Sequence, residues 1–460
     1  MGWFDKLRSS RGGRSGSKQA RAIDTTRWFA APADRSAGAR FEEAHFPRFQ
    51  SSASDQIDHR GDDPLSALRV RLRSAFTPAQ PITDRRMFAG RTTVLTNLIR
   101  SIEDQRLHTV IYGERGLGKT SLLHVLAQAA RDARYLVVYV TCGAGSTFDE
   151  TFRTIAAGIP LLFHEQFGPT APEAERGDAF STLLPTETVT VRTAEDLLIK
   201  VVGTRVLVVL DEFDRAESEE FRRNIAELVK SLSDRAVRVQ LVIAGVAANL
   251  NELVTNVPSV QRNIFALHVP KMDGEEIREL IKNGEGVVGL TFDEPAVRAV
   301  VSLAIGLPYL ATLLSHRAAL VAINQGRATV HVGDVATAND EAVQEFRGRI
   351  SRRTQIQIDD QVNKGQLALL GVLAGAAQTT GGPFIGEDLN PLHADRATVE
   401  AARLLVDKLA AKQVLFHAQE EEFGRTYTFI EDTAPAYLWL LSVVARASGG
   451  EKAGVLRATG

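Results

Sequence analysis

The sequence contains few of the features that mark secreted, zinc-binding or membrane-spanning proteins. Cys142 is its single cysteine, which excludes a disulfide framework and a zinc site of the usual kinds, because both need several cysteines. No apolar run approaches the roughly eighteen residues of a transmembrane helix, and no secretory apolar core follows Met1. We therefore expect a cytoplasmic protein without a membrane span.

The sequence also lacks an excess of charge of either sign. It carries 54 Lys and Arg residues against 56 Asp and Glu residues, so no global field marks nucleic acid or a membrane as the partner. A length of 460 residues, 44% of them hydrophobic, is enough for two to three domains with cores of their own.

A glycine-rich segment provides the most specific motif. Residues 113–120 read Gly-Glu-Arg-Gly-Leu-Gly-Lys-Thr and fit the pattern G-x-x-x-x-G-K-[ST]. An apolar strand at 108–112 precedes them, and apolar residues at helical spacing over 121–130 follow. Glycines let backbone N–H groups turn toward a phosphate chain, and the helix that follows presents its positive end to the same anion. This context predicts a nucleotide-binding loop.

Each residue type in this loop has an expected role. Lys119 would reach the β- and γ-phosphates of ATP, and the Thr120 hydroxyl would hold Mg²⁺. The residues that we expect to bind the nucleotide here are Gly113, Glu114, Arg115, Gly116, Leu117, Gly118, Lys119, Thr120 and Ser121.

A second segment supplies candidate catalytic acids. Residues 205–214 form an apolar run that ends in Asp-Glu-Phe-Asp, as expected for a buried parallel strand whose last residues reach the ligand-binding edge of a sheet. Asp211 is the candidate to hold Mg²⁺, and Glu212 is the candidate base for the attacking water. We predict that both act together with Lys119.

The periodicity of the chain predicts an α/β fold. We expect strands at 107–112, 135–142, 204–210, 237–245 and 264–269, alternating with helices, which is typical of a parallel sheet covered by helices on both faces. The Gly-, Pro- and Thr-rich segment 164–194 is expected to be a long surface loop. An apolar stripe that includes Leu65, Leu68, Val70 and Leu72 marks the start of ordered structure near residue 63.

The two ends of the chain follow other patterns. Residues 1–40 carry nine Lys or Arg and three Asp without periodicity, which predicts a mobile basic arm that is either a solvated tail or a contact to phosphates or an acidic surface. Residues 273–352 look purely helical. Helices at 365–376 and 396–412 precede two strands at 414–419 and 426–430, which is the arrangement of a winged helix.

These motifs together resemble the AAA+ ATPases of the origin-recognition-like branch and their bacterial STAND-type relatives. The resemblance rests on Phe88-Ala-Gly-Arg91, the loop 113–120, the acidic strand end at 210–214, the helical region and the hairpin, and it covers roughly residues 64–445. It implies a P-loop NTPase fold with five segments. They are a basic arm at 1–62, an AAA+ domain at 63–272, a helical lid at 273–355, a winged-helix domain at 360–446 and a disordered tail at 447–460.

The resemblance also implies roles for residues outside the loop. Phe88, Gly90 and Arg91 would lie beside the adenine, with a core aromatic as the alternative for Phe88. Asn249 would be the polar sensor of the γ-phosphate. Arg262 would be an arginine finger that reaches the nucleotide of a neighbouring subunit, which implies a homo-oligomer, with a surface arginine that caps a helix end as the alternative.

The leading functional hypothesis is an ATPase that hydrolyses ATP slowly with Mg²⁺ and acts as an assembly or conformational switch. The lid carries Gly306-Leu-Pro-Tyr309 where the replicative branch has an arginine after a glycine, which favours the switch. The alternatives are a DNA-binding loader of the origin-recognition or transposition type, and a scaffold that binds nucleotide without hydrolysis. DNA would be contacted by the N-terminal arm and the winged helix.

The sequence leaves the partner open. The candidate recognition helix of the winged helix carries Arg403, Lys408 and Lys412, but the wing begins with Gln-Glu-Glu-Glu at 419–422, and carboxylates repel DNA phosphates. DNA and a protein partner therefore both remain candidates, as do ATP and GTP.

Overall fold

The computed structural model describes residues 64–447 except 79, 83–84, 169, 236, 248–260, 390–394 and 422–423. The predictions made for the basic arm, for Asn249 and for nearly all of the tail at 447–460 lie outside these residues. No helix among the described residues is long and apolar enough to cross a membrane.

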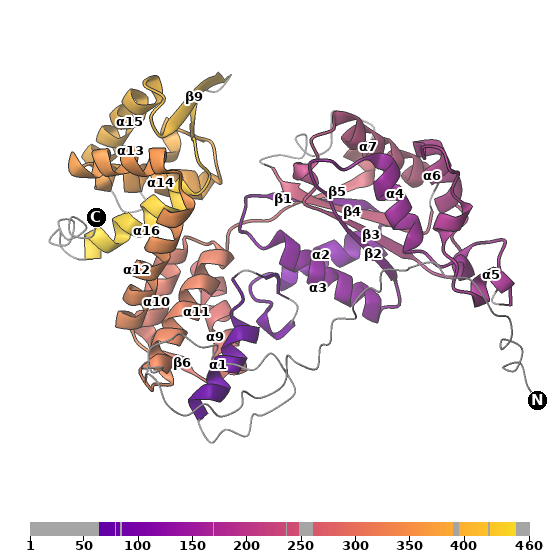
Figure 1. Cartoon of the computed structure of the whole chain (residues 1–460), viewed down its shortest axis with the longest axis horizontal. Helices are drawn as coiled ribbons and strands as arrows, with labels where there is room; N and C mark the ends of the chain where they lie inside the picture. Colours follow the sequence, from indigo (N-terminus) through magenta and orange to yellow (C-terminus); the bar gives the residue numbers. More distant parts are fainter. Residues whose placement is uncertain are drawn as a thin grey trace, which may run out of the picture. The chain divides into compact units, whose positions relative to one another are not determined.

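The N-terminal half contains a five-stranded sheet in the order β2-β3-β4-β1-β5 (Figure 1). Every neighbouring pair is parallel. The strands are β1 (His108–Gly113), β2 (Leu136–Thr141), β3 (Val206–Asp211), β4 (Val239–Val246) and β5 (Ile264–His268). All five predicted strands are confirmed, with their bounds shifted by no more than two residues.

Helices cover both faces of the sheet, because alternate strand residues enter two separate cores. Leu207 and Val209 of β3 pack with α2 (Thr92–Glu103) and α3 (Lys119–Asp132). Val208 and Leu210 pack on the other face with α4 (Phe148–Ala157), α6 (Val191–Leu198) and α7 (Glu219–Asp234). Figure 1 shows α2 and α3 on one side of the strands and α4 and α7 on the other. All six residues of β3 are buried, as the apolar run at 205–210 predicted.

The expectation of a long surface loop at 164–194 is wrong for much of that segment. It contains α5 (Pro172–Glu175) and the 3₁₀ turn η5 (Phe180–Leu183), and it follows the turn η4 (Leu161–Phe163). The Phe180 ring is fully buried in the second core. Arg153 of α4 donates hydrogen bonds to the carbonyls of Pro185 and Glu187. A buried aromatic anchor therefore holds a segment whose composition resembles that of a loop.

The lid region is helical, with one exception. It contains α9 (Gly274–Val288), α10 (Glu294–Ala304), α11 (Pro308–Asn324) and α12 (Val332–Arg349), and α1 (Pro64–Ala75) packs against α9 and α11. The short strands β6 (Thr291–Phe292) and β7 (Thr329–Val330) pair in parallel, so the prediction of a purely helical region was wrong there. Leu68 and Leu72 of α1 are buried as expected, whereas Val70 is 41% exposed.

The C-terminal region combines helices with a small antiparallel sheet. The helices are α13 (Arg352–Asn363), α14 (Leu367–Thr380), α15 (Arg396–Ala411) and α16 (Ala434–Ala447). The sheet has the order β8-β10-β9, with β8 (Phe384–Ile385), β9 (Phe416–Glu421) and β10 (Gly424–Phe429). The predicted hairpin is confirmed by the pairing of β9 with β10. The assignment of this region as a winged helix stays a prediction, and so do the domain boundaries.

His108 is an ionisable residue in the first position of β1. It is only 3% exposed, and its Nδ1 accepts a hydrogen bond of 2.9 Å from the backbone N–H of Leu241 in β4. Burial lowers its pKa from 6.5 to about 4, because a charged imidazole is poorly solvated there and a protonated Nδ1 could not accept that bond. The ring is therefore neutral in the folded protein at physiological pH.

This burial predicts acid sensitivity of the fold. Below about pH 6.5 the unfolded chain takes up a proton on His108 that the folded chain refuses until about pH 4. Folding stability should therefore fall as pH drops through that window, by up to about 3 kcal/mol. The variant His108→Gln removes the titration, so its thermal unfolding midpoint should fall less between about pH 7 and pH 5 than that of wild type. Exposed His417→Gln is the control, and an equal fall in His108→Gln and wild type would contradict the assignment.

Candidate functional site

The loop between β1 and α3 has the conformation that its glycines permit. Gly113, Gly116 and Gly118 have φ values of 144°, 83° and 80°, which residues with a Cβ rarely adopt. A Cβ on Gly113 would lie 2.9 Å from the carbonyl oxygen of Val269, so the loop also packs too closely for a side chain there. The backbone thus forms a cradle at the N-terminus of α3, as an anion site requires.

Lys119 spans this cradle. Its Nζ donates hydrogen bonds of 2.8 Å to the carbonyl oxygens of Gly113 and Glu114, and the residue is 9% exposed. Burial lowers the pKa of Lys119 to about 8, and the nearby carboxylates of Asp214 and Asp211 partly offset that effect. The amino group is therefore a cation with little water around it, held within the loop that would enclose a phosphate chain.

Asp211 presents a buried carboxylate at the end of β3. It is 4% exposed, and its Oδ1 accepts a hydrogen bond of 2.8 Å from the backbone N–H of Glu212. Its Oδ2 accepts one of 2.7 Å from the Tyr139 hydroxyl. Asp214 is held in a similar way, because its Oδ1 accepts from the N–H of Val246 at the end of β4. Each of the two acids near Lys119 thus accepts one hydrogen bond from a residue of a neighbouring strand, Tyr139 of β2 or Val246 of β4.

Glu212 begins the 3₁₀ turn η6 (Phe213–Arg215) in a left-handed conformation with φ of 53°. This conformation is uncommon for a residue with a Cβ and carries strain. The Glu212 carboxylate forms an ion pair of 2.6 Å with Arg215, and the two side chains are 42% and 60% exposed. The candidate base Glu212 is therefore partly exposed to solvent, and its carboxylate is paired with the guanidinium of Arg215 in the same turn.

The donor set around Asp211 fits Mg²⁺. No group of three His, Cys, Asp or Glu residues that could hold a metal occurs among the described residues. Thr120 and Asp211 would be two protein ligands of Mg²⁺, and phosphate oxygens and water would fill the remaining positions, as is usual for Mg²⁺ bound with a nucleotide. The glycine cradle fits a phosphate chain for the reasons given above.

The segment before α2 supports the loop from outside. The Arg91 side chain is buried and donates hydrogen bonds to the carbonyl oxygens of Leu117 and Pro270, and burial lowers the pKa of Arg91 to about 10. Its guanidinium braces the phosphate loop against the segment after β5. Phe88 is partly buried against the core, and the Gly90 N–H donates to Glu279 of α9. A role for these residues beside the adenine stays a prediction.

Other loop residues also make contacts with the protein body. Glu114 forms an ion pair of 3.2 Å with Lys271, and burial raises the pKa of Glu114. Leu117 is 1% exposed in the core. The Ser121 hydroxyl accepts a hydrogen bond from the N–H of Ile82. Arg115 alone of this group is exposed.

The lid reaches the loop through the first turn of α11. A Cβ on Gly116 would lie 3.6 Å from the Cβ of Tyr309, so the tyrosine lies directly over the loop. Gly306 has φ of 73°, and a Cβ there would lie 2.6 Å from the carbonyl oxygen of Met272. The glycine therefore permits the close approach between the lid and the segment after β5. Arg262 is exposed in the 3₁₀ turn η7 (Gln261–Asn263).

Four residues that contact the predicted site residues or lie near Lys119 were not assigned a role from the sequence. They are Tyr139, Asp214, Arg215 and Lys271. A single tyrosine in the apolar run 136–141 is the only signal that could have drawn attention to Tyr139. Asp214 and Arg215 follow the predicted acids directly, but their partners depend on the local turn. Lys271 lies more than 150 residues from Glu114 in sequence, so no local pattern indicates that pair.

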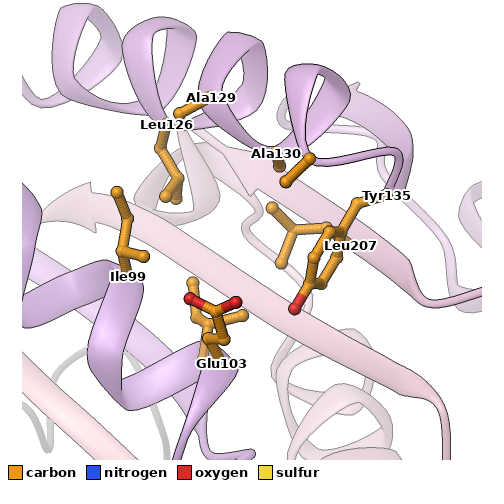
Figure 2. Close-up of a pocket in the computed structure, with 9 residues that line it drawn as sticks. Ile99, Glu103, Leu126, Ala129, Ala130, Tyr135 and Leu207 are labelled. Carbon is orange, nitrogen blue, oxygen red and sulfur yellow. The ribbon is translucent and has the colours of Figure 1, made fainter.

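An apolar pocket of about 370 Å³, counting its open mouth, lies at the opposite end of β3 from Asp211. Figure 2 shows side chains of α2 and α3 around it, together with Tyr135 and Leu207. The lining residues are Ile99, Ile102, Glu103, Leu126, Ala129, Ala130, Ala133, Tyr135 and Leu207. Leu207 is the second residue of β3, whereas Asp211 is the last, so this pocket is separate from the candidate nucleotide site.

Comparison with solved structures finds chains of low sequence identity. Cdc6p from Pyrobaculum aerophilum is 14% identical, with 82% of this chain and 98% of that chain covered at a TM-score of 0.42. The Orc1 protein of Aeropyrum pernix, solved in complex with DNA, is 16% identical, with 82% and 98% covered and a TM-score of 0.42. The RuvB Holliday junction branch migration motor of Thermotoga maritima is 14% identical, with 76% and 95% covered and a TM-score of 0.40.

No curated protein matches the sequence. A family model does match, over residues 75–370, and its description is Novel STAND NTPase 1. The match covers well over half of the chain, from the end of α1 through the phosphate loop, the acidic strand end and the lid to the start of α14. It agrees with the resemblance to STAND-type P-loop NTPases that the motifs carry. The chain therefore belongs to the Novel STAND NTPase 1 family of nucleotide-binding proteins.

Proposed function

We propose that this NTPase binds ATP with Mg²⁺, hydrolyses it slowly, and uses the bound nucleotide to control an assembly or conformational switch. One observation carries the proposal. A candidate base, Glu212, stands next to the buried Asp211 but is held in an ion pair by Arg215 at 2.6 Å. A base that is present but restrained is what a slow, regulated hydrolase needs, whereas a scaffold that only binds nucleotide needs no such base.

The proposed binding mode assigns a task to each residue of the site. The glycine cradle would bind the phosphate chain through backbone N–H groups, and Lys119 would exchange its two carbonyl partners for phosphate oxygens. Thr120 and Asp211 would hold Mg²⁺, which neutralises charge on the phosphates when bound. Glu212 would accept a proton from the attacking water once it leaves Arg215.

The switch is supported by the position of the lid. Tyr309 of α11 lies over Gly116, and Glu276 and Glu279 of α9 pack at Gly90. Two lid helices therefore contact segments that would surround the nucleotide. A ligand in the cradle would act on both contacts, so its presence would change the free energy of lid closure.

A protein partner is better supported than DNA for the C-terminal surface. Arg403 donates to the carbonyl oxygen of Gly386 at 2.8 Å, so its charge is directed into the protein. Arg425 pairs with Glu420 and Asp407, which cancels much of the positive charge beside the acidic strand β9. Lys408 and Lys412 are exposed, and two lysines give a weak electrostatic footprint for a duplex. A DNA-binding loader thus remains the alternative.

The first test concerns nucleotide binding. The variant Lys119→Ala removes a desolvated cation, so it should lose most of its affinity for ATP while its thermal unfolding midpoint stays the same or rises. Calorimetric titration with ATP and with GTP measures both the affinity and the preference for adenine or guanine. Exposed Lys230→Ala of α7 is the matched control. Unchanged ATP affinity in Lys119→Ala would refute the assignment of the loop.

The second test concerns the restrained base. Glu212→Gln should reduce ATP turnover by on the order of a hundredfold while ATP still binds. Arg215→Gln should raise turnover by a few-fold, because it frees the carboxylate from an exposed and therefore weak ion pair. The double variant should behave like Glu212→Gln. A faster double variant would show that Arg215 acts elsewhere, and equal turnover in Glu212→Gln and wild type would remove Glu212 from the mechanism.

The third test concerns assembly and Arg262. If Arg262 completes the site of a neighbouring subunit, turnover per subunit should rise with protein concentration, in parallel with particle size in sedimentation with Mg²⁺ and ATP. Arg262→Ala should lose that rise and keep only the low turnover of dilute wild type. Exposed Arg223→Ala of α7 should retain it. Turnover that is independent of concentration in wild type would argue against the finger.

A further inference from the structure

We propose that Tyr139 is a positioning residue for the metal site, which together with His124 holds the Asp211 carboxylate in one orientation. The inference rests on the proposed Mg²⁺-dependent nucleotide binding and adds to it a pair of residues outside both sequence motifs. It predicts that metal affinity, and not only activity, depends on the Tyr139 hydroxyl.

The first observation is the engagement of both carboxylate oxygens of Asp211. Oδ2 accepts a hydrogen bond of 2.7 Å from the Tyr139 hydroxyl, and Oδ1 accepts one of 2.8 Å from the N–H of Glu212. The two donors come from different strands or turns, so the carboxylate cannot rotate without breaking a bond. Hydrogen bonds to a charged acceptor are among the stronger ones in proteins. The remaining lone pairs of Asp211 are therefore kept in one orientation.

The second observation is the support behind the tyrosine. The His124 imidazole stacks on the Tyr139 ring, with centroids 5.0 Å apart and planes 16° apart. His124 lies on α3 four residues after Thr120, so the two residues share one face of the helix, one turn apart. The stack of His124 on Tyr139 therefore joins α3, which carries the candidate ligand Thr120, to β2, the strand beside the candidate ligand Asp211.

The third observation is the position of Tyr139 in the sheet. Tyr139 of β2 lies opposite Val209 of β3. Val209 precedes Asp211 by two residues in the same strand. A side chain at this register point is on the same face of the sheet as α3, because Val209 belongs to the core that α2 and α3 cover. The phenol thus spans from the edge strand across the end of β3 to the phosphate-loop helix.

The alternative is that the hydroxyl merely satisfies a buried carboxylate. A structural role of that kind would lower stability when the hydroxyl is lost and would leave metal affinity unchanged. A positioning role would lower metal affinity, because groups that orient a metal ligand typically change affinity by about tenfold to a hundredfold when removed. The two roles therefore separate when metal affinity and stability are measured together.

The experiment uses the full chain and the variant Tyr139→Phe, which keeps the ring stack and deletes only the hydroxyl. Mn²⁺ binding is measured by electron paramagnetic resonance in the presence of a non-hydrolysable ATP analogue, and analogue affinity is measured with EDTA. Tyr139→Phe should bind Mn²⁺ about tenfold more weakly than wild type, with unchanged affinity for the analogue in EDTA. Tyr135→Phe, whose hydroxyl lies near Arg205 at the other end of the sheet, is the control.

A second variant tests the ring stack. His124→Leu retains bulk but removes the stacking partner, and it should weaken Mn²⁺ binding less than Tyr139→Phe does. Unchanged Mn²⁺ affinity in Tyr139→Phe, with or without a loss of thermal stability, would overturn the inference. If wild type itself binds neither the analogue nor Mn²⁺, the proposed function fails as well, so the two failures are distinguishable.

Discussion

The desolvated charge of Lys119 beside Asp211 and Asp214 is the interaction around which the site is organised. A buried ammonium group is costly unless acceptors and carboxylates surround it, and here two backbone carbonyls and two acids do so. The sheet order makes this possible. Because all five strands are parallel, the loop after β1 and the acids after β3 reach one edge, with β4 between them. The fold thus brings together charges that lie about ninety residues apart in sequence.

Three other charged residues of the site, Glu212, Glu114 and Arg91, also have partners within the protein. Glu212 pairs with Arg215, Glu114 pairs with Lys271, and Arg91 donates to two carbonyl oxygens. A nucleotide that enters the cradle brings negative charge next to Lys119 and Lys271, so it competes with these internal partners. Its binding free energy is then divided between new contacts and the rearrangement of old ones. Because part of the binding free energy would rearrange existing ion pairs and hydrogen bonds, the arrangement favours a conformational switch over rapid turnover.

The sheet, the phosphate loop and the acidic strand end could be predicted because their signals are local. Apolar runs identify β1 to β5, and glycines with a following lysine identify the loop. What failed depends on contacts distant in sequence. Phe180 anchors a segment that looks like a loop, and the Tyr139 hydroxyl donates to Asp211 from the neighbouring strand. The hydrogen bonds of Arg91 to the carbonyl oxygens of Leu117 and Pro270 were likewise not predicted. Hydrophobic periodicity of 2 or 3.6 residues does not predict such contacts, because they join residues that are distant in sequence and come together only in the folded chain.

The lid limits how the site can distinguish ATP from ADP. It meets the loop through Tyr309, an aromatic residue without a charge. Tyr309 can report whether the cradle is filled, but it cannot supply a cation to a terminal phosphate. In the proposed function, the charge that responds to the γ-phosphate would come from Lys119, from Arg215 once it leaves Glu212, or from Arg262 of a neighbouring subunit. In the proposed function, lid closure would therefore follow occupancy of the loop, whereas hydrolysis would require the freed base and assembly.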